Sequence, residues 1–355
     1  VKTIDGGYEF GLFKNKLTLE AGWYRKSTTN LLLNAQLPRT TGFSTAVKNI
    51  GELRNEGWEF TLNTYNITTP KFKWQSSFNI SFNKNKVMSL ADGQQSLSST
   101  VAYVSQFNKP LYIAEVGKPS GMMIGYIWDG NYQYSDFDNP SSGVYILKPN
   151  VSGNGSVRST IQPGDIKYKD LNGDGTMTDA DVTFIGRGQP IHTGGFTNNF
   201  SYKGFELNVF FSWSYGNNIF NANRLIMEGN SNGWALINQY ATYADRWSPT
   251  NPSNLYYRTR GQGPIGLFSS RTVEDGSYIK LKTVSLSYSV PYNIIKKLYM
   301  SNLSLSVSGQ NLHTWTKYSG LDPEVSTRGD LLTPGFDYSS YPRSPMIVFG
   351  LKAAF

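Results

Sequence analysis

Apolar and polar positions alternate with a period of two along much of this chain. In the segment 72–83, for example, five of the six even-numbered positions hold phenylalanine, tryptophan or isoleucine, and polar residues stand between them. A period of two places successive side chains on opposite faces of a β-strand. Such segments therefore predict strands that have one apolar face and one polar face.

The alternation predicts eleven strands, ten of which form pairs joined by the shorter connections. The pairs are 4–12 with 17–24, 58–63 with 72–83, 111–116 with 122–132, 194–202 with 205–215 and 278–290 with 302–312, and the last strand is 345–355. Long segments separate the pairs, at about 28–56, 84–109, 134–193, 216–277 and 313–344. If these strands cross a bacterial outer membrane and the last strand ends on the periplasmic side, all the long segments lie outside the cell.

This separation of short and long connections favours an all-β fold of one kind, a transmembrane antiparallel β-barrel. Outer-membrane barrels have short periplasmic turns and long extracellular loops, whereas a soluble sandwich or propeller has no reason to separate the two. Aromatic residues make up 14% of the chain, which suits girdles at the two membrane interfaces. We therefore expect a bacterial outer-membrane location. The inward faces are expected to line a hydrated lumen with Glu20, Glu59, Gln75, Asn79, Asn199, Glu206 and Lys280.

An odd number of strands predicts that the barrel continues beyond this chain. Bacterial single-chain barrels have an even number of strands, and unpaired strand edges are not tolerated in hydrocarbon. Val1 is not an initiator methionine, and no signal peptide precedes the first strand. We expect residues 1–355 to be the C-terminal portion of a larger barrel, with an extracellular insertion at about 134–193.

Composition argues against several classes of function. The chain has no cysteine, which excludes disulfides, thiolate metal sites and thiol nucleophiles. Its net charge is +8, but lysine and arginine are scattered without a basic run, so we expect no nucleic-acid binding. His192 and His313 are far apart in the sequence, and no nucleophile, zinc-protease or phosphate-loop motif is present. We therefore expect no enzymatic activity.

One local motif predicts a calcium site. The segment 170–181 (DLNGDGTMTDAD) follows the pattern of an EF-hand loop, in which oxygen ligands occupy positions 1, 3, 5, 7 and 12 and a glycine occupies position 6. The predicted ligands are Asp170, Asn172, Asp174, Thr176 and Asp181. An aspartate at position 12 replaces the usual glutamate, and its shorter side chain weakens the prediction of bidentate binding. The alternative is an Asx-rich turn that holds no metal.

The long segments also contain aromatic and arginine side chains that could bind a glycan or a peptide. Aromatic rings stack on apolar faces, and guanidinium groups donate hydrogen bonds to polar edges. The candidate substrate residues are Tyr132, Trp234, Tyr240, Trp247, Tyr257 and Arg258. The alternative is that these side chains pack the loops against one another or against a partner protein.

Several short stretches, spread over the whole chain, resemble the C-terminal barrel half of SusC-like (SusC/RagA) TonB-dependent transporters of Bacteroidetes. The stretches include 55–60 (NEGWEF), 164–170 (GDIKYKD), 202–207 (YKGFEL), 246–249 (RWSP), 310–312 (QNL) and 320–324 (GLDPE). The resemblance implies a 22-stranded barrel of which this chain is the second half. It also implies a plug domain and a TonB box, both N-terminal to this chain, and a SusD-like surface lipoprotein over the barrel mouth.

The resemblance implies TonB-dependent import of an oligomeric nutrient, and the sequence leaves open whether the cargo is a glycan or a peptide. Two other classes of function remain as alternatives. One is a barrel that serves as a structural or assembly component of a surface complex. The other is a secreted calcium-binding, carbohydrate-active β-protein.

Overall fold

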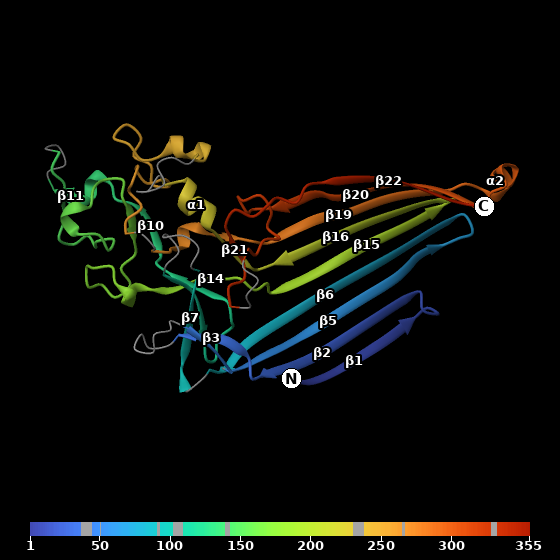
Figure 1. Cartoon of the computed structure of the whole chain (residues 1–355), viewed down its shortest axis with the longest axis horizontal. Helices are drawn as coiled ribbons and strands as arrows, with labels where there is room; N and C mark the ends of the chain where they lie inside the picture. The colour runs from blue at the N-terminus through green and yellow to red at the C-terminus, as the bar shows by residue number, and fades with distance from the viewer. Residues whose placement is uncertain are drawn as a thin grey trace.

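The alternating segments form one large antiparallel sheet, which we call the barrel wall (Figure 1). The computed structural model describes residues 1–36, 45–49, 51–90, 93–101, 109–138, 143–229, 238–264, 267–327 and 332–355. Within them the wall has nine strands in the order β1-β2-β5-β6-β15-β16-β19-β20-β22. Their bounds are β1 Lys2–Leu12, β2 Leu17–Thr29, β5 Glu52–Thr68, β6 Phe72–Ser89, β15 His192–Tyr202, β16 Phe205–Tyr215, β19 Tyr278–Ser289, β20 Asn302–Thr316 and β22 Met346–Ala354.

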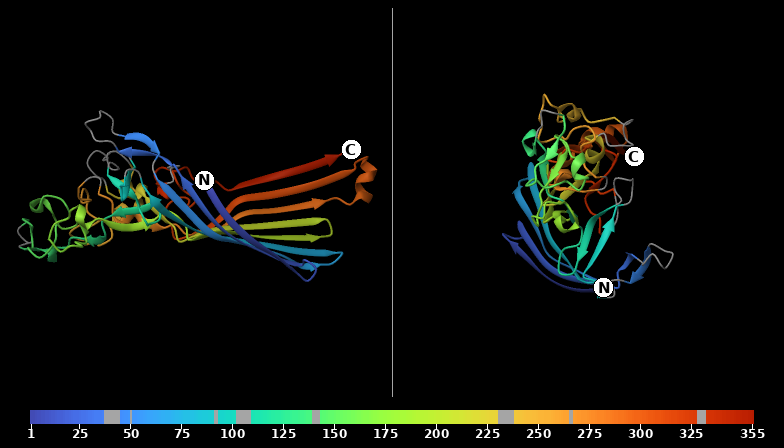
Figure 2. Two further views of the ribbon diagram at one scale, coloured as in Figure 1. Left: turned by 90° about the horizontal axis from the view of Figure 1, so that it is seen from below. Right: turned by 90° about the vertical axis from the view of Figure 1, so that its left-hand side faces the viewer.

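The predicted separation of short and long connections is confirmed. The segments 13–16, 69–71, 203–204 and 290–301 connect strands at one end of the wall, where the chain also ends (Figure 1, right). The segments 30–51, 90–191, 216–277 and 317–345 connect strands at the other end. Seen from that end, the wall is curved, and its two edge strands, β1 and β22, are not paired with each other (Figure 2, right).

The number of wall strands differs from the prediction, because the third predicted pair does not belong to the wall. Residues 111–116 and 122–132 form the short strands β8 (Pro110–Glu115), β9 (Met122–Gly125) and β10 (Trp128–Asn131). β8 and β9 pair within a separate sheet of order β14-β9-β8-β7. Leu111 and Tyr112 are consecutive and both fully buried, so β8 lacks the single polar face of a wall strand. The insertion between the wall strands β6 and β15 consequently covers 90–191, and the segment predicted as an extracellular insertion, 134–193, is part of it.

The wall strands have the predicted two faces. On the outward face, Phe10, Phe349 and Leu351 are exposed to the surroundings of the wall. On the inward face, the hydroxyl of Ser81 donates a hydrogen bond to Glu59 over 3.4 Å, and the amide of Asn208 donates to Asn199 over 2.7 Å. The apolar face is thus turned toward lipid and the polar face toward the lumen.

Three insertions fold together at the long-loop end, and we call 90–191, 216–277 and 317–345 the loop domain (Figure 2, left). Its main core contains Met123 from the first insertion, Phe220 and Phe268 from the second, and Phe336 from the third. The rings of Phe220 and Phe336 stack with their centroids 6.0 Å apart. The three insertions therefore share one hydrophobic core.

The remaining elements are short. No helix among the described residues is long and apolar enough to cross a membrane. The other strands are β3 Leu32–Gln36, β4 Thr45–Asn49, β7 Ser96–Thr100, β11 Phe137–Asp138, β12 Ile146–Leu147, β13 Ile166–Tyr168, β14 Thr183–Arg187, β17 Asn218–Asn221, β18 Val273–Asp275 and β21 Phe336–Asp337. The helices are α1 Ala222–Met227 and α2 Tyr292–Ile295, with 3-10 turns at Tyr134–Asp136, Arg158–Thr160, Asp179–Asp181, Ala241–Asp245, Ser270–Thr272 and Lys296–Leu298.

Candidate functional site: the lumen wall and the loop domain

The inward face of the wall forms a polar surface below the loop domain. A hollow of about 400 Å³ on this face is lined by residues of β6, β15, β16 and β19, among them Lys73, Gln75, Asn199 and Glu206. Three of these, Gln75, Asn199 and Glu206, are predicted lumen residues. Their amides and charged groups can hydrogen-bond to water or to a polar solute that passes along the wall.

A buried lysine joins the wall to the third insertion. Lys280 on β19 is almost fully buried, and its Nζ lies 3.1 Å from Asp322 and 2.8 Å from Glu324. Arg343 and Lys282 contact the same Glu324 at 2.7 and 3.4 Å. Burial raises the pKa of Glu324, but the hydrogen bond and charge of Lys280, with the other donors, outweigh this effect and lower it to about 2. Glu324 is therefore ionised at neutral pH and holds its loop on the lumen face.

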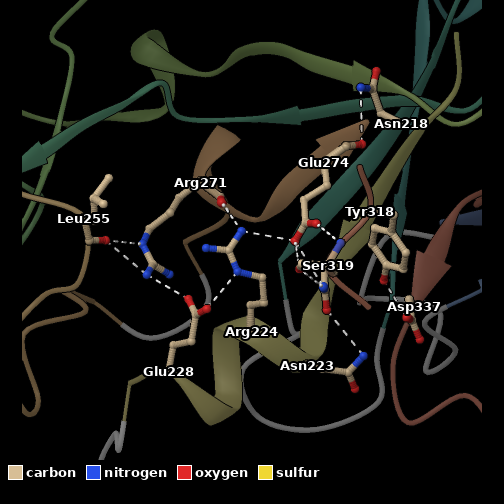
Figure 3. A network of polar contacts seen from close by, with 11 residues as sticks. Asn218, Asn223, Arg224, Glu228, Leu255, Arg271, Glu274, Tyr318, Ser319 and Asp337 are labelled. Atoms are coloured by element: carbon tan, nitrogen blue, oxygen red, sulfur yellow. Dashed lines mark hydrogen bonds and ion pairs between the residues drawn. The ribbon is translucent and has the colours of Figure 1, made fainter. Parts of the chain in front are cut away.

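A second ion network ties the insertions to one another (Figure 3). Glu228, at the end of α1, accepts a hydrogen bond from Arg224 at 2.9 Å and forms an ion pair with Arg271 at 2.8 Å. Arg224 also contacts Glu274 at 3.1 Å, and Glu274 accepts from the backbone N–H of Ser319 in the third insertion at 2.7 Å. The side chains of Glu228 and Arg271 are almost fully buried. Because buried charges must be paired, these ion pairs hold α1 against 271–274 within the second insertion, and Glu274 links this unit to the third insertion through Ser319.

The predicted calcium loop folds into a tight turn. Asp170 accepts hydrogen bonds from the backbone N–H groups of Gly173 and Gly175, and Asp174 accepts from both the N–H and the hydroxyl of Thr176. These hydrogen bonds lower the pKa of both aspartates, so the turn carries two ionised carboxylates. Asp181 is buried.

The carboxylates of this turn already have donors within the protein. Asp181 accepts from the N–H groups of Leu171 at 2.9 Å and Thr178 at 2.9 Å, and Asn172 accepts from the N–H of Asp174 at 3.0 Å. Among the described residues, no three histidine, aspartate or glutamate side chains are grouped to hold a metal. Oxygen-rich residues suit calcium, but backbone donors occupy the same carboxylates in this conformation.

Three of the candidate substrate residues lie inside the loop domain. Tyr132 is fully buried and donates to the carbonyl of Ser152 over 2.6 Å. Trp247 is buried and its Nε1 donates to Gln133 over 3.2 Å. Tyr257 is buried, with the guanidinium of Arg271 4.9 Å from its ring centroid. These contacts favour the packing alternative for the three rings.

The other three candidates differ in position. Arg258 forms an ion pair with Asp165 at 2.7 Å, and burial raises the pKa of Asp165 although Arg258 acts in the opposite direction. Tyr240 remains exposed. Trp234 lies outside the described residues. Whether any of the six contacts a substrate stays a prediction.

The polar residues that assemble the loop domain were not predicted. Glu228, Arg271 and Glu274 stand alone in long polar segments, and their partners are up to 50 residues away. Only Arg224 and Glu228, four residues apart on one helix face, carry a local signal.

The whole chain is similar to curated TonB-dependent receptors. It is 35% identical to TonB-dependent receptor P3 of Formosa agariphila over 360 residues and 26% identical to TonB-dependent receptor SusC of Bacteroides thetaiotaomicron over 362 residues. These matches cover 100% and 99% of the chain but 34% and 32% of the relatives. The chain therefore spans about a third of the length of the relatives that it matches. No family model matches it.

A solved structure has the same fold. The RagAB peptide transporter matches 99% of this chain with a TM-score of 0.77 and 21% identity, and the match covers 35% of that chain. At this identity the likeness establishes the fold alone. The relatives are named as receptors or transporters, and none of them is named as an enzyme. The prediction of an outer-membrane barrel is confirmed.

Proposed function

We propose that this chain is part of a SusC-like TonB-dependent receptor of the outer membrane, and that the protein containing it imports an oligomeric nutrient. The observation that carries the proposal is the arrangement of a polar lumen wall beneath a folded loop domain. A solute released from the loops would meet the hydrated face of β6, β15, β16 and β19 and not an apolar surface. Further strands would close the wall between β1 and β22.

The proposed mechanism needs three partners outside this chain. A SusD-like lipoprotein would cover the loop domain and retain the cargo, as the resemblance to SusC implies. TonB would act on a plug domain to open the lumen, and outer-membrane lipid would surround the outward apolar face. The cargo is a glycan or a peptide, because aromatic and arginine side chains at the loops suit both. No covalent chemistry is involved.

Uptake by cells tests this proposal. A strain that lacks the full gene is expected to lose uptake of one class of labelled oligomer, and the intact gene is expected to restore it. A version with its plug domain deleted serves as the coupling control and should not restore energy-dependent uptake. Parallel assays with oligosaccharides and oligopeptides would assign the cargo class. Unchanged uptake of every oligomer in the deletion strain, with loss of a surface complex, would instead support an assembly role.

We also propose that the turn at 170–181 binds a structural calcium ion, with Asp170, Asn172, Asp174, Thr176 and Asp181 as ligands. The spacing of the oxygen-bearing residues and the glycine at position 6 support this proposal. The ion would replace some of the backbone N–H groups that now donate hydrogen bonds to these carboxylates. It would also relieve the repulsion between the carboxylates.

Chelation is expected to loosen this insertion without unfolding the wall. With EDTA, protease cleavage within 143–191 of the full-length protein should speed up, whereas the mobility shift of the folded barrel on heating should not change. Asp174→Asn should make cleavage fast with or without EDTA. Asp179→Asn, a change of an exposed carboxylate that is not a predicted ligand, should keep the response. Equal cleavage of the parent protein with and without EDTA would contradict a calcium site.

A further inference from the structure

A cluster of basic side chains stands on the outward face of the wall, directly beyond an aromatic row. The register pairs Trp23 on β2 with Trp58 on β5, and Trp58 with Phe82 on β6. Half of the Trp58 surface is exposed on this face. Tryptophan rings that face lipid, with charged residues on their long-loop side, are typical of the level of a membrane interface.

The next two rows toward the long-loop end are charged. Two residues further along each strand, the register gives the row Arg25–Glu56–Lys84, and two residues beyond that it pairs Arg54 with Lys86. Each step of two residues is about 6.6 Å along a strand. Because side chains on one face recur every second residue, these charges share the outward face with the aromatic row and stand at headgroup level above it.

These side chains line a hollow of about 410 Å³. Its lining includes five cations, from Arg25, Arg54, Lys84, Lys86 and Arg187, and one anion, from Glu56. Arg25 forms an ion pair with Glu56 at 3.1 Å, and the guanidinium of Arg25 lies 5.4 Å from the ring centroid of Trp23. The hollow therefore keeps a clear excess of positive charge after this pair is formed.

Several donors in the hollow lack partners. The Nε atom of Arg54 is buried without a hydrogen-bond acceptor, and the nearest contact of this guanidinium to a carboxylate is 3.9 Å, to Glu52. Within the part of the chain that the structure describes, neither Lys84 nor Lys86 has an ion-pair partner. A buried donor without an acceptor is costly, and an anion with several oxygens would satisfy it.

We propose that this hollow binds the phosphorylated headgroup of an outer-leaflet glycolipid. The charge excess fits a phosphate, and the aromatic row places the acyl chains of such a lipid against the wall directly below. A free phosphate has the same charge but gains nothing from the row of Trp23, Trp58 and Phe82. The lipid therefore binds the site through both its headgroup and its chains, and this contact is separate from cargo transport.

The test uses the full-length protein in detergent with diphosphoryl lipid A as the probe. Lipid retained after purification is measured by native mass spectrometry. The triple variant Arg54→Gln, Lys84→Gln, Lys86→Gln is expected to retain about tenfold less lipid, since each cation near an anionic surface contributes roughly 1 kcal/mol, or about fivefold, before screening. The control variant Lys14→Gln, Lys16→Gln, Lys71→Gln removes three charges at the short-turn end of the wall and should retain lipid as the parent does.

Two further measurements distinguish a lipid from free phosphate as the ligand and exclude misfolding as the cause of lost binding. Glu56→Gln removes the competing anion, and it is expected to increase retention about threefold, a gain that a folding defect would not produce. Dephosphorylated lipid A should be retained weakly by every variant, and millimolar inorganic phosphate should not displace the lipid. Equal loss in the control variant, or full displacement by inorganic phosphate, would overturn the proposal.

Discussion

Replacement of Glu228 by alanine is expected to loosen the second insertion of the loop domain, and with it the contact of Glu274 to Ser319 in the third insertion, while the wall stays folded. The change leaves Arg224 and Arg271 without their shared carboxylate, and Arg271 is almost fully buried. Loss of one partner from a buried ion network costs about 3–5 kcal/mol. Hydrogen exchange of the full-length protein in detergent should then show faster exchange in α1, in Val273–Asp275 and around Ser319.

The matched control is Glu56→Ala, which removes an acid from an exposed pair with Arg25 at 3.1 Å. Exposed pairs contribute up to about 1 kcal/mol, so exchange in the loop domain should not change. Protection of α1 that is equal in the Glu228 variant and the parent would show that the network in Figure 3 does not hold the second insertion in place.

Replacement of Lys280 by methionine is expected to free the third insertion from the lumen face. The variant leaves the buried Asp322 and the partly buried Glu324 beside each other with only Lys282 and Arg343 nearby. We expect a loss of about 3 kcal/mol in the free energy that holds 317–327 against β19, because Lys280 is the buried member of the cluster. Lys282→Met is a close control, since Lys282 contacts the same Glu324 from an exposed position, and its loss should cost less than about 1 kcal/mol.

The dependence on pH provides a second measurement of this contact. The pKa of Glu324 is lowered from its ordinary value of 4.5 to about 2 in the folded protein. The stabilisation from its charge is therefore complete above about pH 4.5 and is lost as the pH falls toward 2, with a total of about 2 kcal/mol after screening by solvent. In the Lys280→Met variant the pKa of Glu324 should be lowered less, so the loss of stability below pH 4.5 should be smaller than in the parent, whereas Lys282→Met should follow the parent. If hydrogen exchange of 317–327 is the same in both variants at all pH values, Lys280 does not hold the third insertion on the lumen face.

The sequence predicted the wall well because its signal is local. Alternation over 72–83 or 205–215 requires only that neighbouring residues lie on opposite faces, and the lumen residues Gln75, Asn199 and Glu206 follow from the same rule. The strand predicted at 111–116 and its pairing with the segment from Met122 are present, but its place in the wall was wrong, and Leu111 and Tyr112 are apolar in succession. A strand buried on both faces does not alternate, and short apolar segments of that kind occur in any packed domain.

The loop domain could not be predicted in the same way. Tyr132, Trp247 and Tyr257 have the composition of a binding surface, but their burial depends on segments that are distant in the sequence. The same holds for Glu228 and Arg271, which are 43 positions apart in number and meet at 2.8 Å. A motif with fixed spacing, such as 170–181, predicted a turn whose hydrogen bonds are local, and its metal remains a proposal.

The common core of the three insertions limits which changes of sequence the loop domain can accept. Met123, Phe220 and Phe336 interlock across segments that the gene encodes far apart. A single insertion exchanged for that of a relative would bring core side chains that do not fit those of the other two insertions. The loop domain would then lose its packing. New cargo preference is therefore expected to arise from point changes at outlying positions such as Tyr240, or from exchange of all three segments together.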